Sequence, residues 1–270
     1  PAFTGVGNNV TLTINTGPAG TLVNATATPA AGVATFSTFF VQTVGTRTLK
    51  AAGASIVSVP TGSNSFTISP AGADHFTFTG QPSNAVAGVN ISPAIVVQAR
   101  DAFDNLATGF GSKSVTLTIS SGPGVFLSPS NAVVNASGGV ATFSGISIDL
   151  VGAHTLDAIN TVLGDCPTCT SGTSASFNIT PAAATKLGFV QEPTNTVHNV
   201  AISPAVAVAA QDPFGNTDPT FTGTVTISIG VNPASGVLSG TLSQPFGNVT
   251  AGVATFSNLS DAWAAGRASP

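Results

Sequence analysis

Apolar and polar residues alternate in short segments along the chain, and the pattern is clearest between residues 71 and 181. A period of two is typical of a β-strand that buries one face and exposes the other. Six such strands are predicted here, and a seventh, short strand is predicted around residues 124–127. The predicted buried positions of the six strands are Phe76 and Phe78; Ile95, Val97 and Ala99; Val115, Leu117 and Ile119; Ala141 and Phe143; Leu156 and Ala158; and Phe177 and Ile179.

The same segments recur along the chain in the same order. The hexapeptide Gly-Val-Ala-Thr-Phe-Ser at residues 32–37 returns at 139–144 and 252–257, at spacings of 107 and 113 residues. The pentapeptide Val-Thr-Leu-Thr-Ile at residues 10–14 returns unchanged at 115–119. The sequence therefore predicts an all-β protein of tandem repeats of about 110 residues, the size of one immunoglobulin-like (Ig-like) β-sandwich.

These markers divide the chain into three repeats. Residues 71–181 are predicted to form a complete Ig-like repeat, the middle repeat. Residues 1–70 form a first repeat that lacks its first strands, and residues 182–270 form a third repeat that lacks its last strands. The links at residues 69–71 and 180–182 are short, and each contains a proline, whose φ angle is fixed. We therefore expect the repeats to lie nearly end to end, as a semi-rigid rod.

A further motif follows the second predicted strand of a repeat. It reads Asp101-Ala-Phe-Asp-Asn105 in the middle repeat and Asp212-Pro-Phe-Gly-Asn216 in the third repeat. With the Gln-Pro, Ile-Ser-Pro-Ala and Gly-Val-Ala-Thr-Phe-Ser segments around it, the chain resembles the Ig-like repeats of large bacterial surface proteins, of the invasin and intimin type. The resemblance implies surface stalks, adhesins and fibrous layers, and hence an extracellular or cell-surface location. Asp104 replaces the motif's glycine, which is acceptable because aspartate tolerates a left-handed backbone better than most residues.

The composition excludes two classes of partner. Charged residues make up only 6% of the chain, and its six lysines and arginines are scattered, whereas nucleic-acid binding requires clustered cations. No apolar run reaches the length of a membrane-spanning helix, so no membrane span is predicted. Binding to glycans stays possible, although Trp263 is the only tryptophan and the chain has no tyrosine.

The sequence offers no catalytic constellation, and we predict that the chain is not an enzyme. Its histidines, His75, His154 and His198, are far apart in sequence, and no nucleophile motif accompanies them. No glycine-rich phosphate loop follows a strand and opens a helix. We therefore predict neither catalytic residues nor cofactor-binding residues.

The acidic motifs offer one candidate metal site in each of two repeats. The candidate residues are Asp101, Asp104 and Asn105 in the middle repeat and Asp212, Asn216 and Asp218 in the third. Their oxygens suit calcium, which takes about six to eight oxygen ligands. A simpler interpretation is that these Asp and Asn side chains cap their own turns. The sequence leaves both interpretations open.

Cys166 and Cys169 are the only cysteines in the chain. A redox motif of the thioredoxin type needs a βαβ context, and a zinc site needs two further ligands, and the sequence shows neither. We therefore predict a disulfide between Cys166 and Cys169, in the loop before the last strand of the middle repeat. Such a bond fits an oxidising, extracellular setting, and it contributes little stability because the loop it closes is very short.

The near absence of lysine bears on assembly, because soluble β-proteins protect their sheet edges with charged residues. A surface with little charge favours association. We therefore predict an extracellular structural protein that associates with further copies of itself into a filament, sheath or surface layer by strand or edge complementation. The alternative is an adhesin stalk, or a binding module that presents its loops to glycans or proteins.

Overall fold

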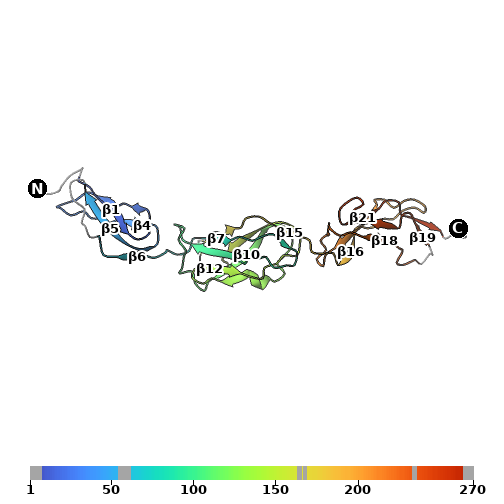
Figure 1. Ribbon diagram of the computed structural model, residues 1–270, viewed down its shortest axis with the longest axis horizontal. Coiled ribbons are helices and arrows are strands. Elements are labelled where there is room, and N and C mark those ends of the chain that lie inside the picture. The colour runs from blue at the N-terminus through green and yellow to red at the C-terminus, as the bar shows by residue number, and fades with distance from the viewer. Residues whose placement is uncertain (1–7, 54–61, 163–165, 167–168, 233–235, 264–270) are drawn as a thin grey trace.

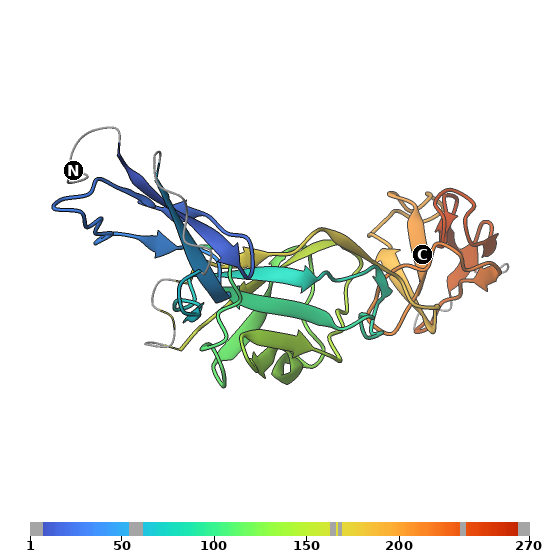
Figure 2. The same cartoon turned by 60° about the vertical axis from the view of Figure 1, so that its left-hand side comes forward.

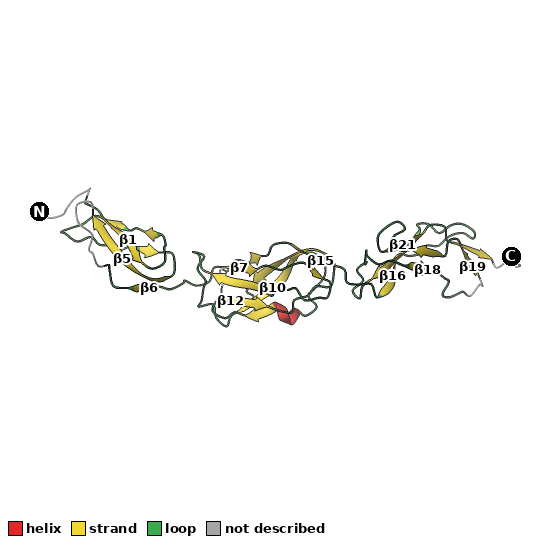
Figure 3. Ribbon diagram, in the orientation of Figure 1, coloured by secondary structure: helices red, strands yellow, loops and turns green. Residues whose placement is uncertain are grey.

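The computed structural model describes residues 8–53, 62–162, 166, 169–232 and 236–263. Within these residues the chain is all β, apart from one short 3-10 helix, η1 (Pro129–Ala132), drawn red in Figure 3. Figure 1 shows three groups of strands that follow one another along the longest axis of the molecule. In the described part of the chain, no helix is long and apolar enough to cross a membrane.

The middle repeat is a sandwich of two sheets. Its strands are β7 (His75–Gly80), β8 (Ala85–Val86), β9 (Ile95–Arg100), β10 (Ser114–Ser121), β11 (Val133–Asn135), β12 (Val140–Phe143), β13 (Gly152–Ile159), β14 (Gly172–Thr173) and β15 (Phe177–Thr180). One sheet has the order β12-β9-β7, and the other has the order β11-β10-β13-β15-β8, with β14 paired to β13. Only the pairing of β15 with β8 is parallel among these strands. This two-sheet arrangement is that of an Ig-like sandwich.

The positions that the alternation predicted as buried form the core between these two sheets. Ile95 and Val97 of β9 are completely buried, as are Leu156 and Ala158 of β13, and Phe143 of β12 is 1% exposed. Each large apolar side chain that is buried in this way stabilises the fold by about 1.5–3 kcal/mol. Of the predicted core positions, only Ile119 is half-buried, at the side of the core.

The first repeat contains the second sheet of the sandwich. Its strands are β1 (Val10–Thr16), β2 (Leu22–Val23), β3 (Thr26–Ala27), β4 (Phe40–Val41), β5 (Gly45–Gly53) and β6 (Phe66–Ile68). They form a sheet of order β3-β1-β5-β6 and a pair β2-β4. The pairing of β1 with β5 shifts register after Ile14, as the pairing of β10 with β13 does after Ile119. The two repeats thus share both their sequence and the position at which the strand pairing becomes irregular.

The third repeat contains the first sheet of the sandwich and parts of the second. Its strands are β16 (Lys186–Gln191), β17 (Val206–Gln211), β18 (Thr224–Thr226), β19 (Gly236–Ser239), β20 (Ser243–Pro245), β21 (Val253–Phe256) and β22 (Ser260–Trp263). They form a sheet β16-β17-β21 and the pairs β18-β20 and β19-β22. Figure 2, turned by 60° from Figure 1, shows this group in orange and red.

The prediction of a seventh strand at residues 124–127 was wrong for the middle repeat. Only a single bridge joins Phe126 to Ile148 there, and the neighbouring backbone N–H of Val125 donates to the carboxylate of Asp149 (2.7 Å). The additional strand of the second sheet is β11, which pairs with β10. In the third repeat the corresponding region is a true ladder, in which β19 pairs with β22.

Candidate functional site at the repeat junctions

Asp101 lies immediately after β9 and is the centre of a closed turn. Its Oδ1 accepts hydrogen bonds from the backbone N–H groups of Phe103 and Asn105 (both 2.9 Å). Its Oδ2 accepts from the Asn105 side-chain amide (3.0 Å) and from the backbone N–H of Ala71 (3.0 Å), which follows the linker proline. Asp101 is buried, with 1% of the residue exposed. Through these hydrogen bonds its carboxylate ties the linker to the turn.

Asn105 extends the same turn across the junction to the first repeat. Its Nδ2 donates to the backbone carbonyl of Gln42 (2.8 Å), and its Oδ1 accepts from the backbone N–H of Val44 (3.2 Å). Residues 42–44 join β4 to β5, and we call them the first docking loop. A single side-chain amide therefore uses both its donor and its acceptor to hold the neighbouring repeat.

The second junction has the same construction. Asp212 is fully buried, and its Oδ1 accepts from the N–H groups of Phe214 and Asn216, while its Oδ2 accepts from Ala182 N–H (3.2 Å) and Asn216 Nδ2 (2.8 Å). Asn216 Nδ2 donates to Asp149 O (2.8 Å), and its Oδ1 accepts from Val151 N–H (3.1 Å). Residues 149–151 form the second docking loop. We call each Asp–Asn pair, Asp101 with Asn105 and Asp212 with Asn216, a junction clamp.

The clamp carboxylates are held in their charged form. Burial alone would raise the pKa of Asp212, but the hydrogen bonds from the side chain and backbone of Asn216 and from the backbone N–H groups of Ala182 and Phe214 together outweigh it. The pKa of Asp212 is therefore below its usual value, and the same balance of causes lowers the pKa of Asp101. Charged acceptors make the stronger hydrogen bonds, which suits a group that fixes a linker.

The two junctions differ in their apolar contact. The ring of Phe214 packs against the core of the middle repeat and lies over Gly88, where an added Cβ would meet ring carbons at 2.6 and 2.7 Å. Phe103, the equivalent residue of the middle repeat, is 48% exposed. Asp218 adds another tie at the second junction, because its Oδ2 accepts from the backbone N–H of Ala184 (3.0 Å). We infer that the second junction is the more tightly held of the two.

The structure brings only some of the predicted metal ligands together. Each clamp pair is in contact, but Asp104 turns away to His75 (3.1 Å) with its side chain 80% exposed. Asp218 accepts hydrogen bonds from the backbone N–H and the hydroxyl of Thr220, and these bonds hold the pKa of Asp218 below its usual value. Asp218 takes no part in the bonds described for the second clamp. In the described residues, no group of three His, Cys, Asp or Glu side chains is placed to hold a metal. N–H donors surround the clamp carboxylates, and calcium binding at these residues stays a prediction.

The remaining candidate residues belong to neither junction clamp. Cys166 and Cys169 form a disulfide, and both pack against the core of the middle repeat near Ala73. His154 is buried in the middle repeat, whereas His198 is exposed in the third. The side chain of Trp263 lies outside the part of the chain whose side chains the structure describes.

One detail of the clamp turns confirms a prediction from sequence. Asp104 has a φ angle of 64° and Gly215 has a φ angle of 93°, so both occupy the left-handed region at the same step of the motif. Aspartate is among the residues that accept this conformation more readily than others. The replacement of glycine by aspartate therefore leaves the turn intact.

Comparisons with known proteins give fold-level similarities. No protein-family model matches the chain, and no curated protein matches it. Among solved structures, the D0–D1 domain of intimin is 15% identical (TM-score 0.27), with 65% of this chain and 83% of that chain covered. The Escherichia coli adhesin FdeC is 13% identical (TM-score 0.37), with 98% and 87% covered. The chain resembles bacterial Ig-like adhesin repeats.

The similarity to adhesin repeats is not exclusive. A β-glycosidase from Bacteroides vulgatus is 13% identical (TM-score 0.33), over 66% of this chain and only 24% of that chain. All these TM-scores are below 0.5, and we therefore assign the Ig-like fold from the strand pairing described above. Neither adhesion nor glycoside hydrolysis is assigned to this chain from these similarities.

Proposed function

We propose that the chain is a segment of an extracellular stalk, a semi-rigid rod of Ig-like repeats of the kind found in surface adhesins. The observation that carries the proposal is the repeated junction clamp. At both junctions a buried aspartate fixes the linker, and an asparagine four residues later holds the docking loop of the preceding repeat. A device that recurs with the same partners at successive junctions supports a role in setting the angle between repeats.

The energies of the clamp bonds suit an orienting role. Each neutral hydrogen bond contributes about 0.5–1.5 kcal/mol, so the two bonds of one asparagine bias the docked arrangement by about 1–3 kcal/mol. This bias adds to the stiffness of the linker, in which proline fixes one φ angle. A stalk of this kind holds whatever lies at its end at a defined distance from the surface.

We expect Asn216→Ala to loosen the second junction and Asn105→Ala to loosen the first. Fluorophores introduced through unnatural amino acids at exposed Val33, Val133 and Val249, one in each repeat, report the distances between repeats. The population outside the docked distance should rise about tenfold at the altered junction and stay constant at the other one, because only that junction loses its two bonds.

Asn131→Ala is the matched control for these variants. Its side-chain amide donates to the carbonyl of Gly145 within the middle repeat (3.1 Å) and does not bond a docking loop. It should leave both distance distributions unchanged. Distributions that are equally narrow in the wild type and in both clamp variants would contradict the rod proposal.

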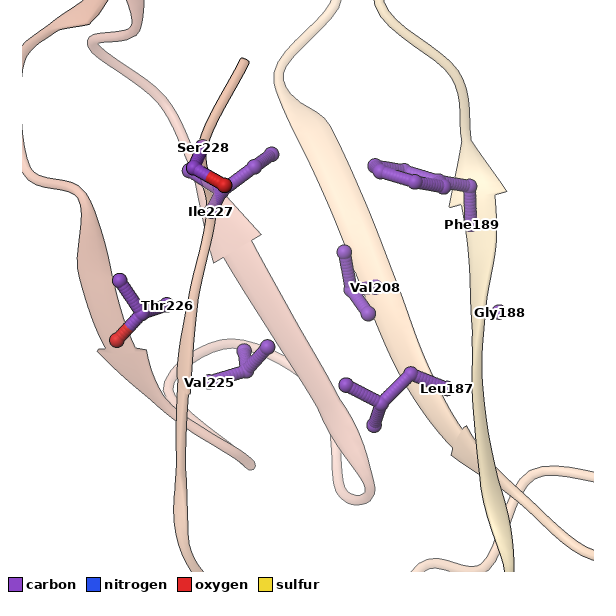
Figure 4. Close-up of a pocket in the computed structure, with 8 residues that line it drawn as sticks. All are labelled: Leu187, Gly188, Phe189, Val208, Val225, Thr226, Ile227 and Ser228. Atoms are coloured by element: carbon purple, nitrogen blue, oxygen red, sulfur yellow. The ribbon is translucent and has the colours of Figure 1, made fainter. Parts of the chain in front are cut away.

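Self-assembly by strand complementation is a second candidate function, and an open apolar face in the third repeat favours it. Leu187 and Phe189 of β16 are 55% and 48% exposed. The equivalent residues of the middle repeat, Phe76 and Phe78, are 3% and 7% exposed, because β13 and β14 lie over β7 there. A cavity of about 250 Å³ opens at this face (Figure 4), with Leu187, Phe189 and Val208 on one side and Val225 and Ile227 on the other.

If strands of a second copy cover this face, we expect assembly to depend on β16. Light scattering after size-exclusion chromatography should show a mass that rises with concentration for the wild type and a constant monomer mass for Phe189→Lys. Val231→Lys is the control, because Val231 is 88% exposed in the same repeat and does not line the cavity. A wild-type chain that stays monomeric at all concentrations would exclude this second function.

A further inference from the structure

A side chain that can carry a positive charge is buried at the same position of two repeats. Arg47 is the third residue of β5 and is 1% exposed, and His154 is the third residue of β13 and is completely buried. The surrounding sequences agree, since both strands begin with glycine and continue with Thr-Leu after the cation. Lysine and arginine are almost never fully buried without partners, so this position calls for an account of what each side chain binds.

His154 faces two backbone carbonyl groups. Its Nδ1 lies 2.8 Å from Gly152 O, and its Nε2 lies 2.8 Å from Pro123 O. A carbonyl oxygen only accepts hydrogen bonds, and a neutral imidazole carries a single N–H. Only the doubly protonated imidazolium can therefore make both bonds at once.

Arg47 shares one equivalent partner with His154, the Pro18 carbonyl, and its other two partners are carbonyls of the first docking loop. Its guanidinium donates to the carbonyls of Thr43 (2.5 Å), Val44 (3.3 Å) and Pro18 (3.4 Å). Pro18 and Pro123 occupy the same place in the repeat, each after a glycine that follows β1 or β10. In both repeats, a side chain that can donate more than one N–H bond thus lies between a Gly-Pro loop and backbone carbonyls at or beside a docking loop.

We propose that this position is a buried brace behind the docking loop, and that His154 makes the second junction sensitive to pH, whereas Arg47 cannot confer such sensitivity on the first. Protonated His154 ties residue 152, next to the second docking loop, to the Gly-Pro loop. Loss of one proton leaves one of the two carbonyls facing a lone pair, so one bond is lost and the docking loop is less firmly held. Arg47 keeps its charge throughout, because arginine is not deprotonated in proteins.

The polar partners of the His154 ring are the carbonyls of Gly152 and Pro123. The ring of Phe177 on β15 lies beside it at 5.8 Å between centroids. β10, β15 and residues 122–127 contain no charged residue. The charged groups on the remaining neighbouring segments are Asp149, which accepts from Val125 N–H, and Asp157 of β13, which accepts from the Thr173 hydroxyl.

Two measurements on the full chain test this inference. Long-range ¹⁵N NMR of the His154 ring reports directly whether one or both nitrogens carry a proton. The three-repeat distance measurement described above is repeated at about pH 5 and about pH 8, the range over which histidine changes charge. As the ring loses its second proton, the undocked population at the second junction should rise about two- to tenfold, the effect of one hydrogen bond. This rise should exceed any change at the first junction, where Arg47 keeps its charge and His75 contacts Asp104 beside the clamp.

Exchanging the two cations provides the control. His154→Arg should keep the second junction docked at both pH values, and Arg47→His should transfer the pH response to the first junction. The inference is overturned if the ring carries a single proton at about pH 5, or if its loss of a proton leaves the second junction unchanged. The pH effect on the junction rests on the proposed rod function. Failure of the rod function would be seen separately, as an unchanged distance distribution in Asn216→Ala.

Discussion

Phe143→Ala is expected to lower the free energy of unfolding of the middle repeat by about 3–5 kcal/mol. The side chain is 1% exposed and ends β12, where it pairs with Ile95 of β9 and packs in the core between the two sheets. Its removal deletes a large buried apolar surface and leaves a cavity that the surrounding strands fill only in part. Calorimetric unfolding of the whole chain measures the loss as a shift of the transition of the middle repeat.

Phe36→Ala is the matched control, because Phe36 stands in an identical hexapeptide of the first repeat. Phe36 is only half-buried and lies in no strand. The expected loss is therefore less than about half of that for Phe143→Ala, since less apolar surface returns to water. Equal losses in the two repeats would show that burial in the structure does not explain the stability of this position.

The identical hexapeptides show what the sequence can and cannot predict. Alternation of apolar and polar residues predicted the strands of the middle repeat and the side of each strand that is buried. The same alternation in residues 10–14 and 115–119 gives a strand in both repeats, but Leu117 is 2% exposed and Leu12 is half-buried. Burial depends on the sheet that lies opposite, and a local pattern carries no information about that sheet.

The junction clamps were predictable only in part. Turn chemistry offered, as the simpler of two interpretations, that Asp101 and Asp212 cap their own turns, and their bonds to the N–H groups of the turn agree with it. The sequence did not indicate that Asn105 and Asn216 bind the preceding repeat, because that bond joins residues more than 60 positions apart. A usable signal was present: both asparagines recur while the residue before them changes from Asp104 to Gly215.

The sequence also failed to indicate that Arg47 and His154 are buried. A histidine at position 154 and an arginine at position 47 show no similarity until the repeats are aligned on the glycine that begins β13 and β5. Both residues interrupt an otherwise apolar face, and such an interruption predicts an exposed residue or an irregular strand. Most of the carbonyls that they contact, those of Pro18, Thr43, Val44 and Pro123, lie in loops, whose course the alternation does not determine.

Asp212→Ala is expected to lower the free energy of unfolding of the third repeat by about 3 kcal/mol and to release the second junction. The fully buried carboxylate accepts from the N–H groups of Ala182, Phe214 and Asn216, and its loss leaves those donors without an acceptor in a site that excludes water. Asp157→Asn is the control, because that side chain accepts from one surface hydroxyl. It should change stability by less than about 0.5 kcal/mol.

Acid should have the same effect on the wild-type chain without a mutation. The pKa of Asp212 is lower in the folded chain than in the unfolded chain, so the unfolded chain binds the proton more readily. The stabilisation is therefore complete above the unfolded pKa of aspartate, about 3.9, and is lost as the pH falls through the folded pKa. Asp212→Asn, which carries no titrating group there, should lose this part of the acid dependence, and Asp101→Asn should lose the corresponding part at the first junction. An acid limb that is identical in the wild type and both variants would show that the clamp carboxylates do not hold the junctions through their charge.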